Sequence, residues 1–543
     1  MLKNYIRETG IYLLLFMSSM FILSSLLFFV NIGISVFHLP LSLVLSGLGY
    51  YLLRRKESLG NLFKVIGLSL VVVLVSILIG MLMFDRSSDG NTYHKDAVGV
   101  LKEGFNPVYG TSLDFIEESR DGNLTQYYIW IDHYAKANWI IGSNFYALTN
   151  NVESGKAMNI ISMWILFSFL FTSLVKLLDN KKAAILSLIV VFNPITVAQI
   201  FTYYNDFLVL IYLFLAILFL IRLDKDINEK EVWLYFSLVF ILLSNFKFNG
   251  LGYLMIFSFI FCLRFLYKAY KNKEFLILFK KLALIFIPLF IISFLVVGYP
   301  TYTKNFIDHG NPFFPLYDKN GEDIISAQQP EKFLKMNTLQ KLYYGTFSKV
   351  NNLREHDNTE IKVPFSINRD EITPAMSVDT RISGWGLLFS GLLLVSLFVL
   401  VRYYKEYKKE TVILFTLSIM TLLLLVMSES WWARYTPHFY LTVIFSLYIL
   451  FKYSDKKWFT RIFVFLIILN TLIPFIGNSY YTLTTSLNIH KTLRGLRNKE
   501  IVVDLRGNHG IIYNLKDYNI KYDLDNIEGN SIFYDLINYE EQE

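Results

Sequence analysis

The sequence predicts an all-α polytopic membrane protein with about 13 transmembrane helices, long extracytoplasmic loops and a small C-terminal α/β appendage. Hydrophobic residues make up 54% of the 543 residues and charged residues only 17%, whereas a soluble chain carries about 25% charged residues. Apolar runs repeatedly approach the roughly 20 residues that a spanning helix needs. The short loops between them alternate between rich and poor in Lys and Arg, which is the pattern that orients polytopic proteins.

The remaining composition excludes several classes of function. The formal net charge of +7 is modest, and in a membrane protein it reflects cytoplasmic anchoring rather than binding of nucleic acid. The single cysteine, Cys262, lies in an apolar run and allows no internal disulfide. The first apolar run follows Lys3 and Arg7, as in a signal peptide. The run is too long for the hydrophobic region of a signal peptide and has no small-residue cleavage site, so we expect a retained membrane anchor.

Thirteen apolar segments are predicted to span the membrane. They cover residues 11–33, 38–53, 62–84, 157–177, 183–201, 206–222, 231–245, 250–267, 282–299, 384–402, 411–428, 436–452 and 459–478. With the N-terminus inside, every predicted inner loop is short and holds at least two Lys or Arg, as in Arg54-Arg55-Lys56. The short outer loops hold at most one each. This alternation predicts a cytoplasmic N-terminus and an extracytoplasmic C-terminus.

The segments divide the chain into three predicted parts. Residues 1–60 form an N-terminal transmembrane hairpin, residues 61–478 a transmembrane core, and residues 479–543 a small extracytoplasmic domain. Two outer loops of the core, 85–156 and 299–383, are too long to be simple connectors. The sequence predicts interfacial helices in the first loop, with aromatic side chains at headgroup depth. These are Trp130, Tyr134, Trp139 and Tyr146. Short strands are predicted in the terminal domain at 501–504, 511–513 and 520–522.

Ionisable side chains are missing from the middle of every predicted span, where carriers and pumps usually need them. They gather instead at the outer ends: Asp85, Asp89, His94, Asp132, His133, Lys136, Asp206, Lys247, His309, Glu429 and Arg434. Outer loops are also polar simply because they face water, but this explains less well why two acids stand directly at a span's end. The pattern favours a reaction at the membrane surface, between a lipid head group and an acceptor from water.

The first candidate site is the stretch FDRSSDGNTYH, from Phe84 to His94. If Asp89 begins a helix, Tyr93 and His94 lie about one turn further on and on nearly the same face. A positioned carboxylate can accept the proton of an acceptor hydroxyl, which is general-base catalysis. The alternative is that Asp89 caps the helix. Asp85 is a second candidate for the same catalytic role.

Several short motifs resemble the GT-C superfamily of membrane glycosyltransferases, which includes the protein O-mannosyltransferases and the lipid A aminoarabinose transferases. They begin at Asp89 (DGNTYHKDAVGVLKEGFNP), His133 (HYAKANWIIGSNFYALTNNVESGKAMN), Thr301 (TYTKNFIDHGNPFFPL) and Trp431 (WWARYTPHFYL). The resemblance to bacterial members covers residues 60 to about 480 in layout. The chain departs from the better-known families because no Asp-Glu dipeptide follows the early span and two extra spans precede it.

The resemblance implies that a sugar is transferred from a polyprenyl-phosphate carrier at the outer face, without a nucleotide. Asp89 matches the position of the family's catalytic acid. Arg434 and Lys247 stand at outer span ends and are candidates for holding the carrier phosphate, since Arg binds phosphate bidentately and Lys acts as a point charge. Interfacial anchoring is their alternative role. Trp432 is either a sugar platform or part of an aromatic belt.

A second polar group follows in the same loop. Asp132, His133 and Lys136 are predicted either to order an interfacial helix or to contact substrate. A divalent metal held by Asp132, His133 and Asp89 is a further alternative. His309 precedes a Gly-Asn-Pro turn and is either a turn residue or a substrate contact. No other cofactor is expected.

The sequence therefore predicts a glycosyltransferase in a bacterial plasma membrane, which uses a polyprenyl-phosphate-linked sugar and an extracytoplasmic glycan, lipid or protein acceptor. Bacterial origin is suggested by the richness in Lys, Ile, Asn, Phe and Tyr. A flippase or transporter of lipid-linked saccharide is the main alternative. A polysaccharide polymerase or ligase with a diphosphate-linked donor, and a non-catalytic scaffold, are the others.

Overall fold

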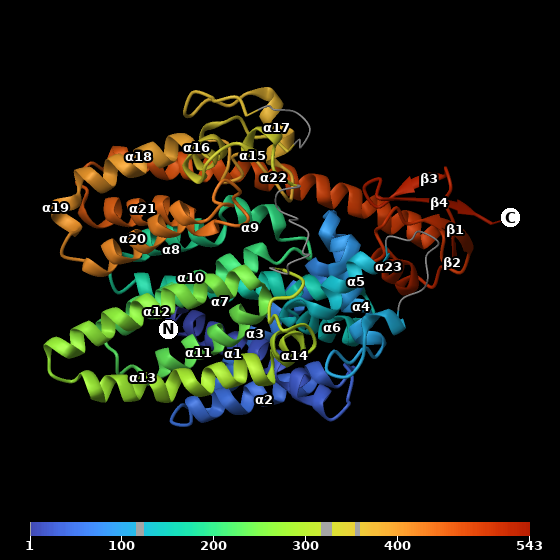
Figure 1. Ribbon diagram of the computed structural model, residues 1–543, viewed down its shortest axis with the longest axis horizontal. Coiled ribbons are helices and arrows are strands. Elements are labelled where there is room, and N and C mark those ends of the chain that lie inside the picture. Colours follow the sequence, from blue (N-terminus) through green and yellow to red (C-terminus); the bar gives the residue numbers. More distant parts are fainter. Residues whose placement is uncertain (1, 116–123, 317–327, 353–358, 543) are drawn as a thin grey trace. The chain divides into compact units, whose positions relative to one another are not determined.

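The computed structural model describes residues 2–115, 124–316, 328–352 and 359–542 (Figure 1). Regular structure in this part is almost entirely helical, with one small sheet near the C-terminus. The chain divides into two compact units. Unit 1 comprises Met1–Ile165, Phe201–Gly321 and Tyr481–Glu543, and unit 2 comprises Leu166–Ile200 and Glu322–Tyr480.

Unit 1 is built around a buried N-terminal helix. Its long helices are α1 (Leu2–Phe29), α2 (His38–Leu53), α3 (Leu59–Leu82), α10 (Asp206–Lys225), α11 (Lys230–Phe246), α12 (Phe248–Lys271) and α13 (Phe275–Phe290). Its shorter helices include α4 (Lys95–Glu103), α5 (Leu124–His133), α6 (Ala137–Thr149) and α14 (Lys304–His309). Helix α1 packs against α2, α3, α6 and α11. Residues 1–60 thus share the core of this unit.

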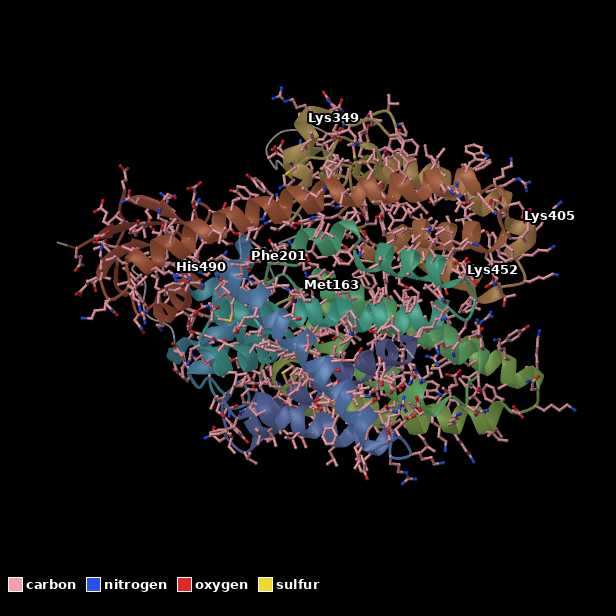
Figure 2. The ribbon with its side chains drawn as sticks, turned by 180° about the vertical axis from the view of Figure 1, so that it is seen from behind. Met163, Phe201, Lys349, Lys405, Lys452 and His490 are labelled. Carbon is pink, nitrogen blue, oxygen red and sulfur yellow. The ribbon has the colours of Figure 1, made fainter. Side chains whose placement is uncertain are left out.

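Unit 2 contains the second group of apolar helices. They are α8 (Asn180–Val191), α9 (Pro194–Gln199), α18 (Phe389–Arg402), α20 (Thr411–Val426), α21 (Leu441–Tyr453) and most of α22 (Lys457–Gly495), with the short α15 (Glu331–Leu334), α16 (Thr338–Phe347), α17 (Arg369–Ala375) and α19 (Tyr404–Tyr407). Helix α7 (Ala157–Leu174) begins in unit 1 and ends in unit 2. Lys405 and Lys452, from two predicted inner loops, lie at the same end of unit 2, and Lys349 of the predicted outer loop lies away from them (Figure 2).

Each of the thirteen predicted segments coincides with one helix or with two consecutive ones. Seven helices in the described part of the chain are long and apolar enough to cross a membrane, and three shorter apolar helices accompany them. This is an all-α membrane protein with a small C-terminal sheet, whereas the count of thirteen spans stays a prediction. The predicted segment 183–201 is divided because Asn193 caps a new helix: its side chain accepts hydrogen bonds from Ile195 N and Thr196 N, each at 3.1 Å.

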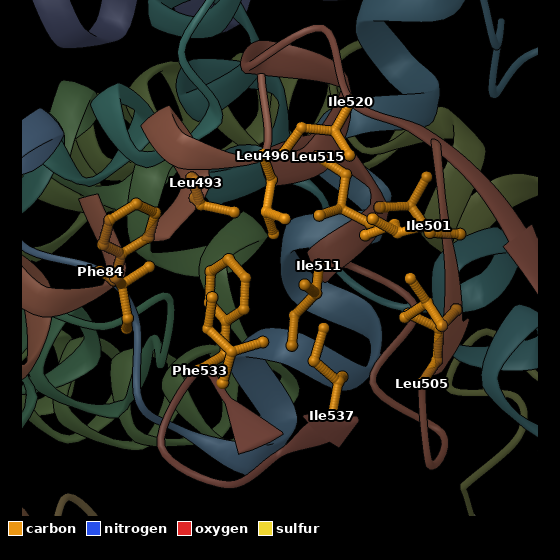
Figure 3. Close-up of a cluster of buried hydrophobic side chains, with 14 residues drawn as sticks. Phe84, Leu493, Leu496, Ile501, Leu505, Ile511, Leu515, Ile520, Phe533 and Ile537 are labelled. Carbon is orange, nitrogen blue, oxygen red and sulfur yellow. The ribbon is translucent and has the colours of Figure 1, made fainter. Parts of the chain in front are cut away.

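The C-terminal domain is an α/β fold whose details differ from the prediction. Its strands are β1 (Glu500–Asp504), β2 (Lys521–Leu524), β3 (Asn530–Ile532) and β4 (Ile537–Glu541), in the order β2-β1-β4-β3. Strands β1 and β2 are parallel, so they require a crossover. The segment 511–513 belongs to that crossover, helix α23 (Ile511–Asp517), and its prediction as a strand was wrong. Ile511, Leu515 and Phe533 contribute to the domain's core (Figure 3).

The first outer loop is folded into unit 1 more tightly than the sequence predicts. Trp139 is 0% exposed and Tyr146 is 2% exposed, because α6 packs against α4 and α1. Protein, not lipid headgroups, covers these two rings. The prediction that the aromatic side chains of α6 lie at headgroup depth was therefore wrong. Packing against other helices removes these apolar rings from water just as the membrane interface would.

Candidate functional site

Asp89 lies in a short loop between the end of α3 and helix α4, all within unit 1. Ser88 is exposed and Asp89 partly exposed, whereas Gly90 and Asn91 are buried. The backbone of Asp89 is helical, with φ −56° and ψ −34°, unlike the extended backbone typical of a capping residue. A π-helical turn at Gly90–His94 follows, and such turns occur frequently at functional sites. The loop thus presents one carboxylate from a largely buried backbone.

Asp85, the second predicted catalytic acid, is fully buried. Its Oδ1 accepts hydrogen bonds from the backbone and side chain of Ser87, both at 2.7 Å. Its Oδ2 accepts one from Tyr203 N at 2.7 Å. Burial raises the pKa of the Asp85 carboxyl, and the ammonium groups of Lys95 and Lys156 oppose that rise. These contacts suit Asp85 to holding the loop rather than to meeting a substrate.

Tyr93 and His94 are brought together with Trp139 of α6. The indole Nε1 of Trp139 donates a hydrogen bond to His94 Nδ1 at 2.7 Å. Because Nδ1 accepts this bond, the neutral imidazole carries its proton on Nε2. The ring of Tyr93, which is partly exposed, packs edge-on against Trp139 with centroids 6.3 Å apart. His94 therefore anchors the turn, and Tyr93 is the more accessible of the two.

A buried cluster of ionic side chains, formed by Glu153, Lys95 and Lys156, contacts this loop. Glu153 accepts from Lys95 Nζ at 2.7 Å and from Lys156 Nζ at 2.5 Å, with all three side chains at most 1% exposed. The backbone N–H of Asp85 also donates to Glu153, at 3.2 Å. Removing one partner from a buried ion pair typically costs about 3–5 kcal/mol, because an uncompensated charge remains. The cluster therefore fixes the chain on both sides of Asp89.

The second predicted polar group also comes together, but its members face protein. Asp132 accepts from Thr111 Oγ1 at 2.6 Å and Ser112 N at 2.8 Å. His133 Nδ1 lies 2.7 Å from Asn305 Oδ1, and its ring packs edge-on against the exposed His309, with centroids 4.9 Å apart. Burial lowers the pKa of the His133 imidazole. This group connects α5 to α14.

Lys136 is buried between the end of α5 and the start of α6. Its Nζ donates to the carbonyl oxygens of Asp132 at 2.7 Å and Tyr134 at 2.8 Å. Burial lowers the pKa of this ammonium to about 7. A cation that binds the last carbonyls of a helix stabilises that helix end. The geometry gives Lys136 this structural role and keeps it from a lipid phosphate.

Lys247, one of the two phosphate candidates, forms an ion pair with Asp206. The Asp206 side chain is 0% exposed and that of Lys247 is 8% exposed. Asp206 begins α10, where a carboxylate is favoured by the helix dipole, and Lys247 separates α11 from α12. The pair therefore joins three helices of unit 1, and the sequence did not reveal it.

Arg434, the other phosphate candidate, lies in unit 2 with Trp432. Arg434 Nη1 donates to Asp379 Oδ2 at 2.9 Å, and the indole Nε1 of Trp432 donates to Asp379 Oδ1 at 3.0 Å. The guanidinium carbon lies 5.3 Å from the Trp432 ring centroid, a cation–π distance. Trp432 is 2% exposed, so protein rather than a lipid belt surrounds it. Asp379 was missed because nothing in its loop sequence distinguishes it.

Within the described residues, no three His, Cys, Asp or Glu side chains are arranged to hold a metal ion. Asp132 and His133 bind Ser112 and Asn305 instead. Unit 1 thus contributes a partly exposed carboxylate, Asp89, on a loop held by buried ion pairs. Unit 2, taken by itself, contains the partly buried pair of Arg434 and Asp379. The sequence matches no protein-family model and no curated protein.

Proposed function

We propose that this protein is a GT-C-type membrane glycosyltransferase that moves a sugar from a polyprenyl-phosphate carrier to an extracytoplasmic acceptor. The observation that carries the proposal is the partial exposure of Asp89 beside the buried residues Gly90 and Asn91, close to the end of the apolar helix α3. A carboxylate held in this way can take the acceptor's proton as the hydroxyl attacks the sugar. The sequence resemblance to GT-C enzymes supports the same role.

Arg434 is the cation that the proposal assigns to the leaving phosphate. A guanidinium has five N–H donors in a planar fork, so it can bind a carboxylate such as Asp379 and a phosphate together. Lys247 is a weaker candidate, because its partner Asp206 is fully buried and needs the charge.

The decisive test compares two acids by sugar transfer from a synthetic polyprenyl-phosphate sugar in nanodiscs. Asp89→Asn keeps the side chain's shape but cannot take a proton, so transfer should fall by about 10²–10⁴ with an unchanged melting temperature. The control, Asp114→Asn, removes an exposed acid of the same outer loop and should transfer normally. Normal transfer by Asp89→Asn would refute the assignment. Donor flipping in liposomes without release of free carrier phosphate would favour the transporter.

A further inference from the structure

We propose that the C-terminal domain positions the Asp89 loop, through Asn514 and Tyr513 of helix α23. This inference rests on the proposed catalytic role of Asp89. It makes the domain part of the catalytic apparatus, although its chain lies about four hundred residues from Asp89 in sequence: Asn514 contacts Lys95 across a separation of 419 residues.

The first attachment lies at the start of the loop. Phe84 is 1% exposed and belongs to the hydrophobic core of the terminal domain, together with Phe533 and Leu493 (Figure 3). Its ring packs edge-on against Phe533 with centroids 5.4 Å apart. Its backbone N–H donates to Ser486 Oγ at 2.9 Å, and its carbonyl accepts from Tyr534 Oη at 3.2 Å. The residue immediately before Asp85 is thus an integral part of the terminal domain.

The second attachment lies just beyond Asp89. Gly510 N donates to the carbonyl oxygen of Asn91 at 2.7 Å. The ring of Tyr513 packs directly on Gly99 of α4, so closely that a Cβ there would lie 2.1 Å from Cζ. Glycine costs helix stability relative to alanine. Its presence inside α4 is explained by this close approach of Tyr513.

The third attachment is Asn514 itself, which completes the buried ion cluster. Its Oδ1 accepts from Lys95 Nζ at 2.8 Å, and its Nδ2 donates to Glu153 Oε1 at 3.0 Å. Lys95 is 0% exposed, so its charge requires such partners. Helix α23 therefore supplies one amide that satisfies both ions of the pair, and it fixes the side of the loop that follows Asp89.

These three attachments lie on both sides of the exposed part of the loop. Ser88 is exposed and Asp89 is partly exposed, while Phe84 and Lys95 are held by the terminal domain. A base must be held in productive geometry, and a displacement of about 1 Å can cost about 100-fold in rate. Loosening α23 should therefore reduce kcat while leaving substrate affinities unchanged.

The test measures loop mobility and turnover separately in the full-length protein. A spin label on Ser88→Cys, in a Cys262→Ser background, reports mobility, and unlabelled protein with native Ser88 gives kcat and KM. Asn514→Leu should increase the label's mobility and lower kcat by about 10–100-fold, with KM for donor and acceptor unchanged. The control is Val503→Ala, which removes core side-chain atoms in strand β1 of the same domain. It should change label mobility and kcat less than Asn514→Leu does.

A double-variant cycle guards against simple misfolding. Gly99→Ala should increase the label's mobility, because its methyl group clashes with the Tyr513 ring. Adding Tyr513→Ala removes that clash, so the label in the double variant should be no more mobile than in Tyr513→Ala alone. Unchanged label mobility in Asn514→Leu, or a change confined to the acceptor's KM, would overturn the positioning role. Because label mobility does not depend on turnover, failure of the proposed function would appear separately: as no sugar transfer by the wild type, or, for the role of Asp89 alone, as full activity of Asp89→Asn.

Discussion

Gly90 lies directly against the carboxylate of Asp85. A Cβ on Gly90 would lie 2.1 Å from Asp85 Oδ2 and 2.2 Å from Ser87 Oγ. Asp85 cannot move away without losing its hydrogen bonds to Ser87 and Tyr203. Glycine beside Asp89 is thus a steric requirement of the loop.

Gly90→Ala should therefore destabilise the protein by about 1–3 kcal/mol, as overpacking typically does, and should lower sugar transfer. Gly47→Ala is the matched control: Gly47 lies inside α2, where a Cβ would meet no described atom within 4 Å. There alanine should stabilise the helix by about 0.5–1 kcal/mol. Thermal unfolding in detergent measures both, and equal melting temperatures would contradict the contact with Asp85.

Lys136 should contribute a pH-dependent stability. Its pKa is lowered to about 7 in the folded protein from the ordinary 10.5. Between pH 7 and about 10 the unfolded chain therefore binds more protons, and stability rises with pH. The melting temperature of the wild type should rise between pH 7 and 9 relative to that of Lys136→Met. Parallel curves for the two proteins would show that the buried ammonium keeps its ordinary pKa.

Arg434 should be needed for turnover through its planar fork as well as its charge. Arg434→Ala should reduce sugar transfer by about 10²–10³, the usual effect of losing a donor to a developing charge. Arg434→Lys keeps the charge, so its rate of sugar transfer should lie between those of Arg434→Ala and the wild type. Arg402→Lys, an exposed arginine over Tyr403, serves as the control. Full transfer by Arg434→Ala would make this residue a structural partner of Asp379 only.

The predicted topology places Ser88 outside the cell and Lys405 inside it. In a Cys262→Ser background, Ser88→Cys should react with a membrane-impermeant thiol reagent on intact cells. Lys405→Cys should react only after permeabilisation. Both side chains are exposed on the protein, so labelling depends only on the side of the membrane on which each residue lies. The reverse labelling pattern would place Asp89 in the cytoplasm.

Hydrophobicity was sufficient to locate the long apolar helices. Apolar runs produced segments that all coincide with helices, because a helix satisfies its backbone hydrogen bonds internally wherever it packs. The secondary structure of the terminal domain was harder to predict. The segment 511–513 was predicted as a strand from its apolar side chains, but short apolar runs do not distinguish a strand from a buried helix, and the parallel pairing of β1 with β2 selects a crossover helix.

The sequence by itself determined that polar groups gather at the ends of apolar helices and that Asp89 stands at one of them. Only the tertiary structure decided which of those groups are buried in pairs. Lys247 meets Asp206 and Lys95 meets Glu153, although 41 and 58 residues separate them along the chain. The physical reason is that a buried charge must find a partner in space, and chain folding, not sequence proximity, brings that partner within reach.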